Sequence, residues 1–525
     1  MSRNPFSFFR AACRGRLPHR RYRELEDRPR RLRARFFSLL TVILGAAYIL
    51  WVSLVVYQNP GVQDGLFLGA EAAAFLLLVI LAFDFWNLRY HRPEGLAPMA
   101  HPAVDIFVPC CGEPLAVIST TLRAVVGISY SPVQVYVLDD GNSPLVADLA
   151  RSLGFNYLSR PQAGLTLQDN KSGNLNFGLA RSQGELILVL DADQVPAPDI
   201  LTRLAGFFRL DRVAYVQSKQ AFFLPEGDPF YNRDEVFYDA VQLSNDQANA
   251  VISCGSGVLY RRRALEEIGG FATWNIVEDL TTSYELVSRG WKGIYLPYAL
   301  ARGLAPQNLA GVYRQRYQWC LDTMRLFFWD NPLFKSGLNF RQRRHFLLIM
   351  LSYLVSGIFF PVFCLIPLLI YLRGDSSLLG RETAYWAMRG AYLGANILMF
   401  RYLFPRGSAL KQFKMLFGLF PVYAAATLAA LFYPPGRKPA YRVNNRRPFA
   451  ACGSWRPLSL HFGVIALHLA LPFLSLWLEW VMPRLIFFNA VFSAVIIWVL
   501  ADLVLTVNSR PRWSPALDPR RFYGA

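Results

Sequence analysis

The stretch "GELILVLDADQVPAPDI", residues 184–200, leads from a run of aliphatic residues directly into two carboxylates, Asp191 and Asp193. A short aliphatic run bounded by polar residues and glycine is typical of a buried strand in a parallel sheet. Side chains two positions apart in an extended strand point to the same face, so the sequence predicts both carboxylates on one side. A divalent cation or solvation could each relieve their repulsion, and this stretch alone leaves both open.

Short strand-like runs and helical runs alternate around this stretch. The runs "AVDIFVPCCGEP", "VQVYVLDDGN" and "FNYL" predict strands, with helices at 114–127, 144–153 and 171–182. This alternation predicts an α/β domain with a doubly wound, Rossmann-like parallel sheet. Ligands of such sheets bind beyond the carboxyl ends of the strands. The acidic residues expected at that edge are Glu113, Asp139, Asp140, Asp191 and Asp193.

The rest of the chain is apolar. Hydrophobic residues make up 54% of its 525 residues, which excludes an ordinary soluble protein. Six apolar runs are long enough to cross a bilayer, at 37–57, 65–86, 345–372, 385–404, 459–480 and 486–507. We expect residues 408–432 to form a helix lying in the membrane interface, with a seventh span as the alternative.

The formal net charge of +19 is concentrated beside the apolar runs, at 1–35, 401–414, 437–447 and 510–521. By the positive-inside rule, this pattern places the α/β domain on the cytosolic side of the membrane. The basic residues flank spans and form no patch interleaved with aromatics, so nucleic acid is not expected as a partner. The seven cysteines include no CxxC pair, and no zinc site is implied.

The resulting organisation has seven parts. They are a basic N-terminal segment at 1–36, transmembrane helices at 37–90, a cytosolic domain at 91–330 with interfacial helices toward its end, transmembrane helices at 331–404, an interfacial helix and loop segment at 405–458, transmembrane helices at 459–508, and a cytoplasmic tail at 509–525.

The ligand class follows from the acidic edge of the sheet. Carboxylates alone would repel phosphate, but a bound Mg²⁺ reverses the local charge, and Lys171 in "DNKSGNLN" adds a cation. The chain lacks the glycine patterns of dinucleotide sites and P-loops at this edge. A nucleotide sugar is the ligand class that remains.

Nine landmarks now follow one another in order: "DIFVPCCGEP", "LDDG", "KSGNLN", "DAD", "QAFFLPEGDPF", "SCGSGVLYRRRALEEIGGF", "VED", "QRYQW" and "YRVNNR". In this respect the chain resembles a processive family 2 glycosyltransferase, specifically the bacterial cellulose synthase catalytic subunit and its relatives. The resemblance implies a GT-A-like cytosolic domain inserted in transmembrane helices. It also implies an inverting enzyme that elongates a β-glucan from a UDP-sugar, most of all UDP-glucose, and translocates the polymer across the plasma membrane, the inner membrane of a bacterium.

The implied partners are the UDP-sugar, the growing polysaccharide, membrane lipids and accessory secretion subunits. The linkage stays open among β-1,4, β-1,3 and mixed products. Two alternatives also stay open: a non-processive enzyme that acts on a lipid carrier, and a catalytically weak synthase-like subunit.

The resemblance assigns roles to the acidic edge. Asp139 and Asp140 would lie near the base and ribose of the nucleotide sugar, with Glu113 and Lys171 also in its binding site. In the family, the DxD pair holds the divalent cation, which makes Asp191 and Asp193 the ligands of Mg²⁺ or Mn²⁺.

The resemblance also assigns the catalytic base. In the family the acid of a TED motif removes the proton from the acceptor hydroxyl, and Asp279 of "VED" occupies this position, with Val277 in place of the usual threonine. An acidic helix N-terminus that favours the helix dipole is the competing interpretation of the same residues.

The motif "QRYQW" departs from the family pattern QxxRW. Gln315, Gln318 and Trp319 share a helix face, with Trp319 as the implied platform for the acceptor sugar. Gln318 replaces the arginine that contacts the diphosphate, and a neutral amide carries no charge. Arg314 and Arg325 lie on roughly the same face by helical spacing and could substitute, whereas Arg316 does not. An amphipathic helix lying on the membrane is the competing interpretation of 313–329.

The segment "YRVNNR" resembles the family's FxVTxK gating loop, which covers the nucleotide. The corresponding residues are Tyr441, Val443, Asn444 and Arg446, and the change from threonine to Asn444 puts the detailed contact in question. A cytoplasmic linker rich in arginine, glycine and proline is the alternative.

Overall fold

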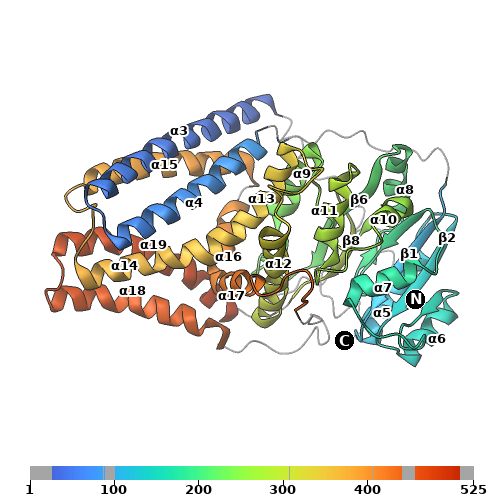
Figure 1. Ribbon diagram of the computed structural model, residues 1–525. Coiled ribbons are helices and arrows are strands. Elements are labelled where there is room, and N and C mark those ends of the chain that lie inside the picture. Colours follow the sequence, from blue (N-terminus) through green and yellow to red (C-terminus); the bar gives the residue numbers. More distant parts are fainter. Residues whose placement is uncertain are drawn as a thin grey trace.

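The computed structural model describes residues 27–86, 88, 101–306, 308–405, 407–439 and 456–508. An α/β domain and a bundle of long helices lie side by side, and α12 (Leu309–Trp329) lies between them (Figure 1). The predicted fold class, an α/β domain inserted between apolar helices, is confirmed.

An eight-stranded sheet forms the centre of the α/β domain, in the order β3-β2-β1-β4-β7-β6-β8-β5. The strands are β1 (Val104–Cys110), β2 (Val133–Asp139), β3 (Asn156–Leu158), β4 (Leu186–Val189), β5 (Val195–Pro196), β6 (Val213–Phe223), β7 (Val258–Arg261) and β8 (Lys292–Leu304). The first four strands of the order are mutually parallel, as predicted. The expectation of a wholly parallel sheet is wrong, because β7 runs antiparallel to both β4 and β6.

Strand β1 is buried along its whole length, as a central parallel strand must be when helices cover both faces of its sheet. Ile106 and Val108 belong to the apolar core on one face, together with α5 (Leu115–Val126) and α6 (Pro144–Ser152). Phe107 belongs to the core on the other face, where α7 (Asn170–Leu179) and α11 (Glu278–Ser288) contribute residues. This alternation is the two-residue period of a strand.

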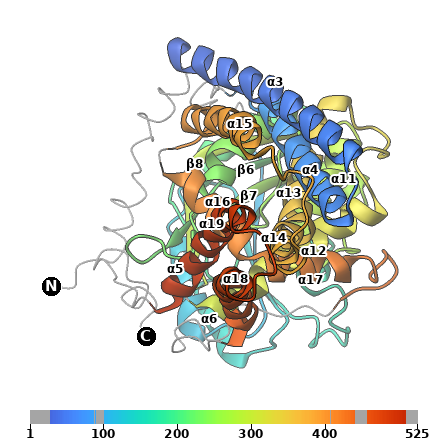
Figure 2. The same ribbon diagram turned by 90° about the vertical axis from the view of Figure 1, so that its left-hand side faces the viewer.

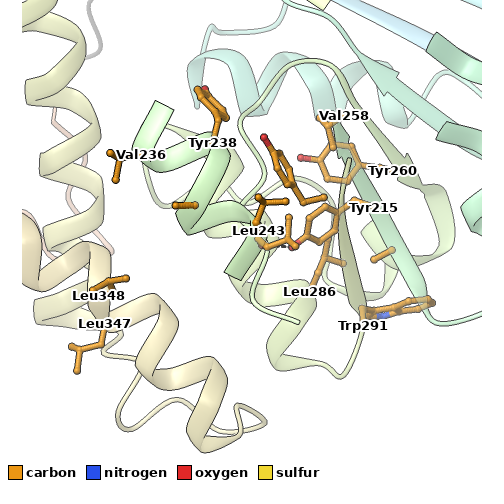
Figure 3. Packing of buried hydrophobic residues seen from close by; sticks show 14 of the residues in the cluster. Tyr215, Val236, Tyr238, Leu243, Val258, Tyr260, Leu286, Trp291, Leu347 and Leu348 are labelled. Atoms are coloured by element: carbon orange, nitrogen blue, oxygen red, sulfur yellow. Dashed lines mark hydrogen bonds between the residues drawn. The ribbon is translucent and has the colours of Figure 1, made fainter. Parts of the chain in front are cut away.

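The second of these cores continues beyond the sheet into the long helices. Figure 3 shows Tyr215 of β6 and Tyr260 of β7 on one side, and Leu347 and Leu348 of α13 (Phe340–Leu354) on the other. Between them lie η2 (Phe237–Val241) and α9 (Gln242–Ala248). One apolar cluster therefore joins the α/β domain to the helical bundle.

Within the described residues, five helical stretches are long and apolar enough to cross a membrane. They are α3 (Arg28–Gln58), α4 (Val62–Asp84), α13 continued through η3 (Val355–Phe359) into α14 (Phe360–Arg373), α18 (Ser459–Trp477) with the short η4 (Arg456–Leu458) before it, and α19 (Pro483–Asn508). These helices indicate a membrane protein.

The predicted span at 385–404 corresponds to α15 (Glu382–Leu403), which packs along α3 in both views (Figures 1 and 2). α15 is not among the five apolar stretches and carries Arg389 in its middle. The count of six spans therefore stays a prediction.

The ambiguous stretch 408–432 forms two helices, α16 (Ser408–Gly418) and α17 (Phe420–Ala430), bent by 58° at their junction. α17 packs against α12 beside the α/β domain, through the cluster that contains Leu321, Met324, Tyr423 and Ala426. Counting the bent pair as one span would raise the number of candidate spans to six.

Candidate active site

Three parallel strands bring the predicted acidic residues to one edge of the sheet. β2, β1 and β4 are neighbours in this order, and their carboxyl ends lead to Asp139, to the turn that carries Glu113, and to Asp191. Neighbouring strands are about 4.8 Å apart, so β2 and β4 are separated by about 10 Å. The side chains at the ends of these strands are therefore close enough together for a single extended ligand to contact them all.

Asp191 and Asp193 lie in a turn that follows β4. The strand ends at Val189, and the backbone N–H of Gln194 donates to the carbonyl of Asp191 at 2.9 Å. Strand alternation does not set the directions of the two carboxylates, because both residues lie beyond the end of β4, in the turn. Asp191 points to Lys171, whereas Asp193 lies beside β8, where a Cβ on Gly303 would be 3.3 Å from its Oδ1.

Lys171, at the start of α7, connects the turn to α11. Its Nζ is 2.8 Å from Oδ1 of Asp191 and 3.0 Å from Oε1 of the buried Glu278. The same ammonium donates to the carbonyl of Gly255 at 2.9 Å. Asp191, Glu278 and Asp279 together outweigh the effect of burial and raise the pKa of Lys171 well above its usual value. The lysine is therefore a fixed positive charge in the middle of the site.

Asp279, the predicted base, lies in the first turn of α11 next to this cation. The N–H of Leu280 donates to its Oδ1 at 2.6 Å. Gly255 has a φ of +72°, and a Cβ there would lie 2.9 Å from Oδ2 of Asp279 and 3.0 Å from Nζ of Lys171. The close approach thus requires glycine at this position. Burial and the charge of Glu278 raise the pKa of Asp279 to about 8, against the opposing effect of Lys171.

Asp139 and Asp140 are held by hydrogen bonds at the end of β2. Asp139 accepts from the N–H groups of Gly141 and Ser143, each at 2.8 Å, and from the hydroxyl of Tyr157 at 2.9 Å. Asp140 forms a two-pronged ion pair with the buried Arg160, at 2.8 and 2.5 Å. These contacts make a rigid rim for the sheet edge.

Arg160 also donates to the carbonyls of Gln168 and Asn170, at 2.5 and 2.9 Å, and so fixes the loop that leads into α7. Arg160 could not be identified from the sequence, because an arginine in a loop carries no periodic or motif signal.

Glu113 follows β1, and its Oε2 accepts from the N–H of Cys111 at 2.6 Å. Burial raises the pKa of Glu113, and the charges of Asp191 and Asp139 act in the same direction. Its carboxylate is therefore within electrostatic reach of both neighbouring strand ends, as the sequence predicted.

The helix α12 carries the "QRYQW" residues. Gln318 is buried, Gln315 and Trp319 are partly buried, and Arg314 is exposed. The guanidinium of Arg316 lies 4.8 Å from the ring centre of Trp319 and pairs with Asp234 at 2.8 Å. The expectation that Arg316 lies off the face of this motif is therefore wrong, because an i, i+3 pair brings it over Trp319.

Arg325 was the second candidate to replace the family arginine, and the structure excludes it from that role. Its side chain has 0% exposure and donates to the carbonyls of Tyr433, Pro434 and Arg437. All its nitrogens thus face protein atoms.

The residues that resemble the gating loop, Tyr441, Val443, Asn444 and Arg446, lie outside the described residues.

The metal site is the other predicted feature. In the described ranges, no group of three or more His, Cys, Asp or Glu side chains could hold a metal ion. Asp191 and Asp193 nevertheless fit Mg²⁺ or Mn²⁺, because such ions are commonly held by one or two carboxylates with substrate phosphates completing the shell.

Glu278 is the main residue of the site to which no sequence motif assigns a role. It precedes the predicted base, and its carboxylate binds Lys171 from inside the protein. The available signal was its place in "VED", but only the fold shows that the side chain points inward.

Two family models match the chain. Residues 101–321 match the glycosyltransferase-like family 2, and residues 266–382 match cellulose synthase.

Among curated proteins, a UDP-forming cellulose synthase 1 catalytic subunit from Komagataeibacter xylinus is 32% identical over 66% of this chain and 47% of its own length. The UDP-forming cellulose synthase catalytic subunit of Xanthomonas axonopodis pv. citri is 35% identical over 54% of this chain and 40% of its own length. The chain thus spans less than half the length of these relatives.

A solved mannosyltransferase from Pyrobaculum calidifontis aligns with 71% of this chain and 98% of its own length, at 18% identity and a TM-score of 0.45. The residues matched by the glycosyltransferase-like family 2 model, 101–321, include the acidic residues at the edge of the sheet. The α/β domain therefore contains a match to the glycosyltransferase-like family 2 at residues 101–321, and the chain is similar to the catalytic subunits of bacterial cellulose synthases.

Proposed function

We propose that this glycosyltransferase elongates a β-glucan by transferring glucose from UDP-glucose with inversion, and that its membrane helices carry the polymer out of the cytosol. The observation that carries this proposal is the cluster in which Lys171 binds Asp191 and Glu278 beside Asp279. The similarity to UDP-forming cellulose synthases supports the choice of donor and product.

Asp279 is the base of the proposed reaction. Its carboxylate takes the proton of the acceptor hydroxyl while the new C–O bond forms at the anomeric carbon. The bond from that carbon to UDP breaks, and its electron pair leaves with UDP. A raised pKa makes Asp279 a stronger base than an exposed aspartate once it is ionised. One base suffices for a single displacement with inversion.

The other residues orient the donor. Lys171 is a permanent cation for the diphosphate, and Asp139, Asp140 and Glu113 form the rim proposed to lie at the uridine end. Asp139 uses three of about four acceptor positions within the protein, so a contact to the nucleotide would use the remaining one.

Asp191 and Asp193 would hold Mg²⁺ or Mn²⁺, and such an ion supplies neutralisation of the charge that develops on UDP. Both side chains are partly exposed at the sheet edge and accessible to an ion from solvent. Because Asp191 is paired with Lys171, its charge is already partly compensated within the protein.

Trp319 is the proposed platform for the acceptor sugar, because the CH face of a sugar stacks on an aromatic ring. Arg316 lies over this ring and would restrict its rotation. Gln318 supplies no charge at the position of the family arginine, so Lys171 is the proposed cation for the diphosphate, with the exposed Arg314 as the remaining alternative.

The test is synthesis by membranes that contain the protein, supplied with single UDP-sugars and Mg²⁺ or Mn²⁺. We expect UDP release and a polymer of β-linked glucose with UDP-glucose, and loss of both with a chelator or in Asp279→Asn. Linkage analysis of the polymer then distinguishes β-1,4, β-1,3 and mixed products.

Two outcomes would contradict the proposal. Label that is extracted as a lipid and never becomes polymeric would identify a non-processive transferase that acts on a lipid carrier. No UDP release from any UDP-sugar would identify a catalytically weak subunit, the outcome that the neutral Gln318 would explain.

A further inference from the structure

A buried charged pair on α12 lies directly behind the turn that carries Asp279. Asp322 and Arg325 are one helical turn apart, with 3.7 Å between Oδ1 of Asp322 and Nη1 of Arg325. Their side chains are 3% and 0% exposed, so neither charge reaches water. Burying an ion pair is costly unless further hydrogen bonds satisfy it. The hydrogen bonds of the two side chains therefore indicate the structural role of the pair.

Asp322 holds the backbone just before the predicted base. Its Oδ2 accepts from the N–H of Val277 at 2.5 Å. Val277 is the residue that precedes the first turn of α11, and Asp279 follows two positions later. This N–H belongs to a helix N-terminus, where backbone donors need partners from outside the helix. The position of Asp279 thus depends on a carboxylate of α12.

Asn275 completes the connection between the pair and the turn. Its Oδ1 accepts from Nη1 of Arg325 at 2.8 Å, and its Nδ2 donates to Oγ1 of Thr281 at 2.8 Å. Nδ2 also lies 3.4 Å from the carbonyl of Asp322. Arg325 thus holds the turn from one side while Asp322 holds it from the other.

Arg325 also fixes a third segment. Its Nε donates to the carbonyl of Tyr433 at 2.8 Å, and its Nη2 donates to those of Pro434 and Arg437, each at 3.2 Å. The indole ring of Trp274 lies 5.2 Å from the guanidinium carbon. The buried guanidinium of Arg325 therefore connects three segments through its contacts: the turn 274–279, helix α12 and the residues that follow α17.

The same helix carries the proposed acceptor platform. Trp319 lies three residues before Asp322, one turn along α12. An attachment of Val277 to Asp322 therefore fixes the separation between Asp279 and Trp319 through one rigid element. A displacement of about 1 Å between reacting groups can cost about a hundredfold in rate.

We propose that Asp322 and Arg325 are positioning residues that fix the base Asp279 relative to the acceptor platform on α12. This inference rests on the proposed function and adds two residues to its machinery. Neither residue touches substrate; both act through the turn 274–279.

The test measures UDP release per folded protein for Asp322→Ala, Asp322→Asn, Arg325→Ala and Arg325→Lys. We expect kcat to fall about ten- to a hundredfold in the alanine variants, while KM for UDP-glucose stays within about twofold. Asp322→Asn retains an oxygen acceptor for the N–H of Val277, so most of the rate should return. Arg325→Lys cannot reach all the carbonyls at once and should stay impaired.

Arg261→Ala is the matched control. Arg261 also donates to three backbone carbonyls, those of Val213, Phe208 and Leu210. It pairs in register with Leu186 at the start of β4, the end of the sheet opposite Asp191. Its loss should lower thermal stability and leave kcat per folded protein unchanged.

Three results would overturn the inference. They are folded Asp322 and Arg325 variants with the kcat of the wild type, a rise of KM in step with the fall of kcat, and an equal loss of kcat in Arg261→Ala. If the alanine variants do not fold, a rate for Asp322→Asn no higher than that of Arg325→Lys overturns it. If the wild type itself releases no UDP, the proposed function is wrong. If the wild type releases UDP and the variants give one of the results above, only the positioning role of Asp322 and Arg325 is wrong.

Discussion

Asp279 has a carboxyl group that is costly for the folded chain to keep ionised. Burial beside Glu278 raises its pKa to about 8, whereas an aspartate in an unfolded chain titrates near 4. Between these values the folded state binds a proton that the unfolded state does not, so the stability contributed by this group falls as pH rises. We expect Asp279→Asn to melt at a higher temperature than the wild type near neutral pH, while releasing no UDP.

The difference in melting temperature should shrink as pH falls toward 4 and vanish below it, where the wild-type carboxyl is protonated in both states. Thermal unfolding in detergent at several pH values measures it. A lower melting temperature for Asp279→Asn near neutral pH would contradict the pKa assignment.

The same group predicts the pH dependence of the reaction. A base must be deprotonated, so kcat/KM should fall about tenfold per pH unit below a pKa near 8. The charged groups facing Asp279 are Lys171, Glu278 and, further away, Asp191. Glu278→Gln removes a negative neighbour and should move the acidic limb to lower pH. Lys171→Met should move it to higher pH, measured on the residual activity.

These two shifts have opposite signs, so a general effect of damage to the site cannot produce both. An acidic limb that stays in place in both variants would assign the titration to another group.

Individual elements are stabilised by polar contacts as well as by apolar packing. Glu71 of α4 is buried, and its carboxylate binds Arg389 of α15. The guanidinium of Arg389 lies 5.2 Å from the ring centre of Tyr48 on α3. Replacing either partner with alanine leaves one charge buried without its counterpart, and we expect a loss of about 3–5 kcal/mol in stability.

The variants Glu71→Ala and Arg389→Ala should therefore melt well below the wild type in detergent. The double variant Glu71→Arg with Arg389→Glu should recover part of the loss, since it restores opposite charges. Asp148→Ala is the control, because its pair with Arg151 is exposed and should contribute little. Full stability in both single variants would show that α15 is held by apolar contacts alone.

The elements that could be predicted from the sequence are those with a clear period or length. The strands around Phe107, Val137 and Leu188 lie within the predicted runs, because each is a short, mostly apolar run ended by acidic or turn residues. β5 has two residues and β7 has four, too few to show a period, so the antiparallel part of the sheet could not be anticipated.

The candidate site divides in the same way. Lys171, Asp191 and Asp279 were found because motifs carry them, and the fold brings them together. The prediction that Arg325 could replace the family arginine is wrong, because helical spacing gives the helix face on which a residue lies but not which segment packs against that face. Here the partner is the segment that includes Pro434, about a hundred residues later in the chain.

At the scale of the whole molecule, the α/β domain and the apolar helices share one core. The cluster that contains Tyr215 and Tyr260 also contains Leu347 of α13 (Figure 3). Leu403 of α15 belongs to the same cluster. Polar contacts follow the same route, since the hydroxyl of Ser244 on α9 donates to the carbonyl of Asp84 at 2.5 Å. Because the two parts share a core, we expect them to unfold together.

Asp84 makes this coupling testable. It ends α4, its side chain has 0% exposure, and its carboxylate binds Arg344 at the start of α13. Asp84→Ala leaves the half-buried guanidinium of Arg344 without its carboxylate, and we expect the melting temperature to fall by several degrees. Because the core is continuous, loss of UDP release on heating and loss of tryptophan burial should shift together to the same lower midpoint. Separate midpoints, with the activity surviving after the helices have unfolded, would show that the α/β domain is stable on its own.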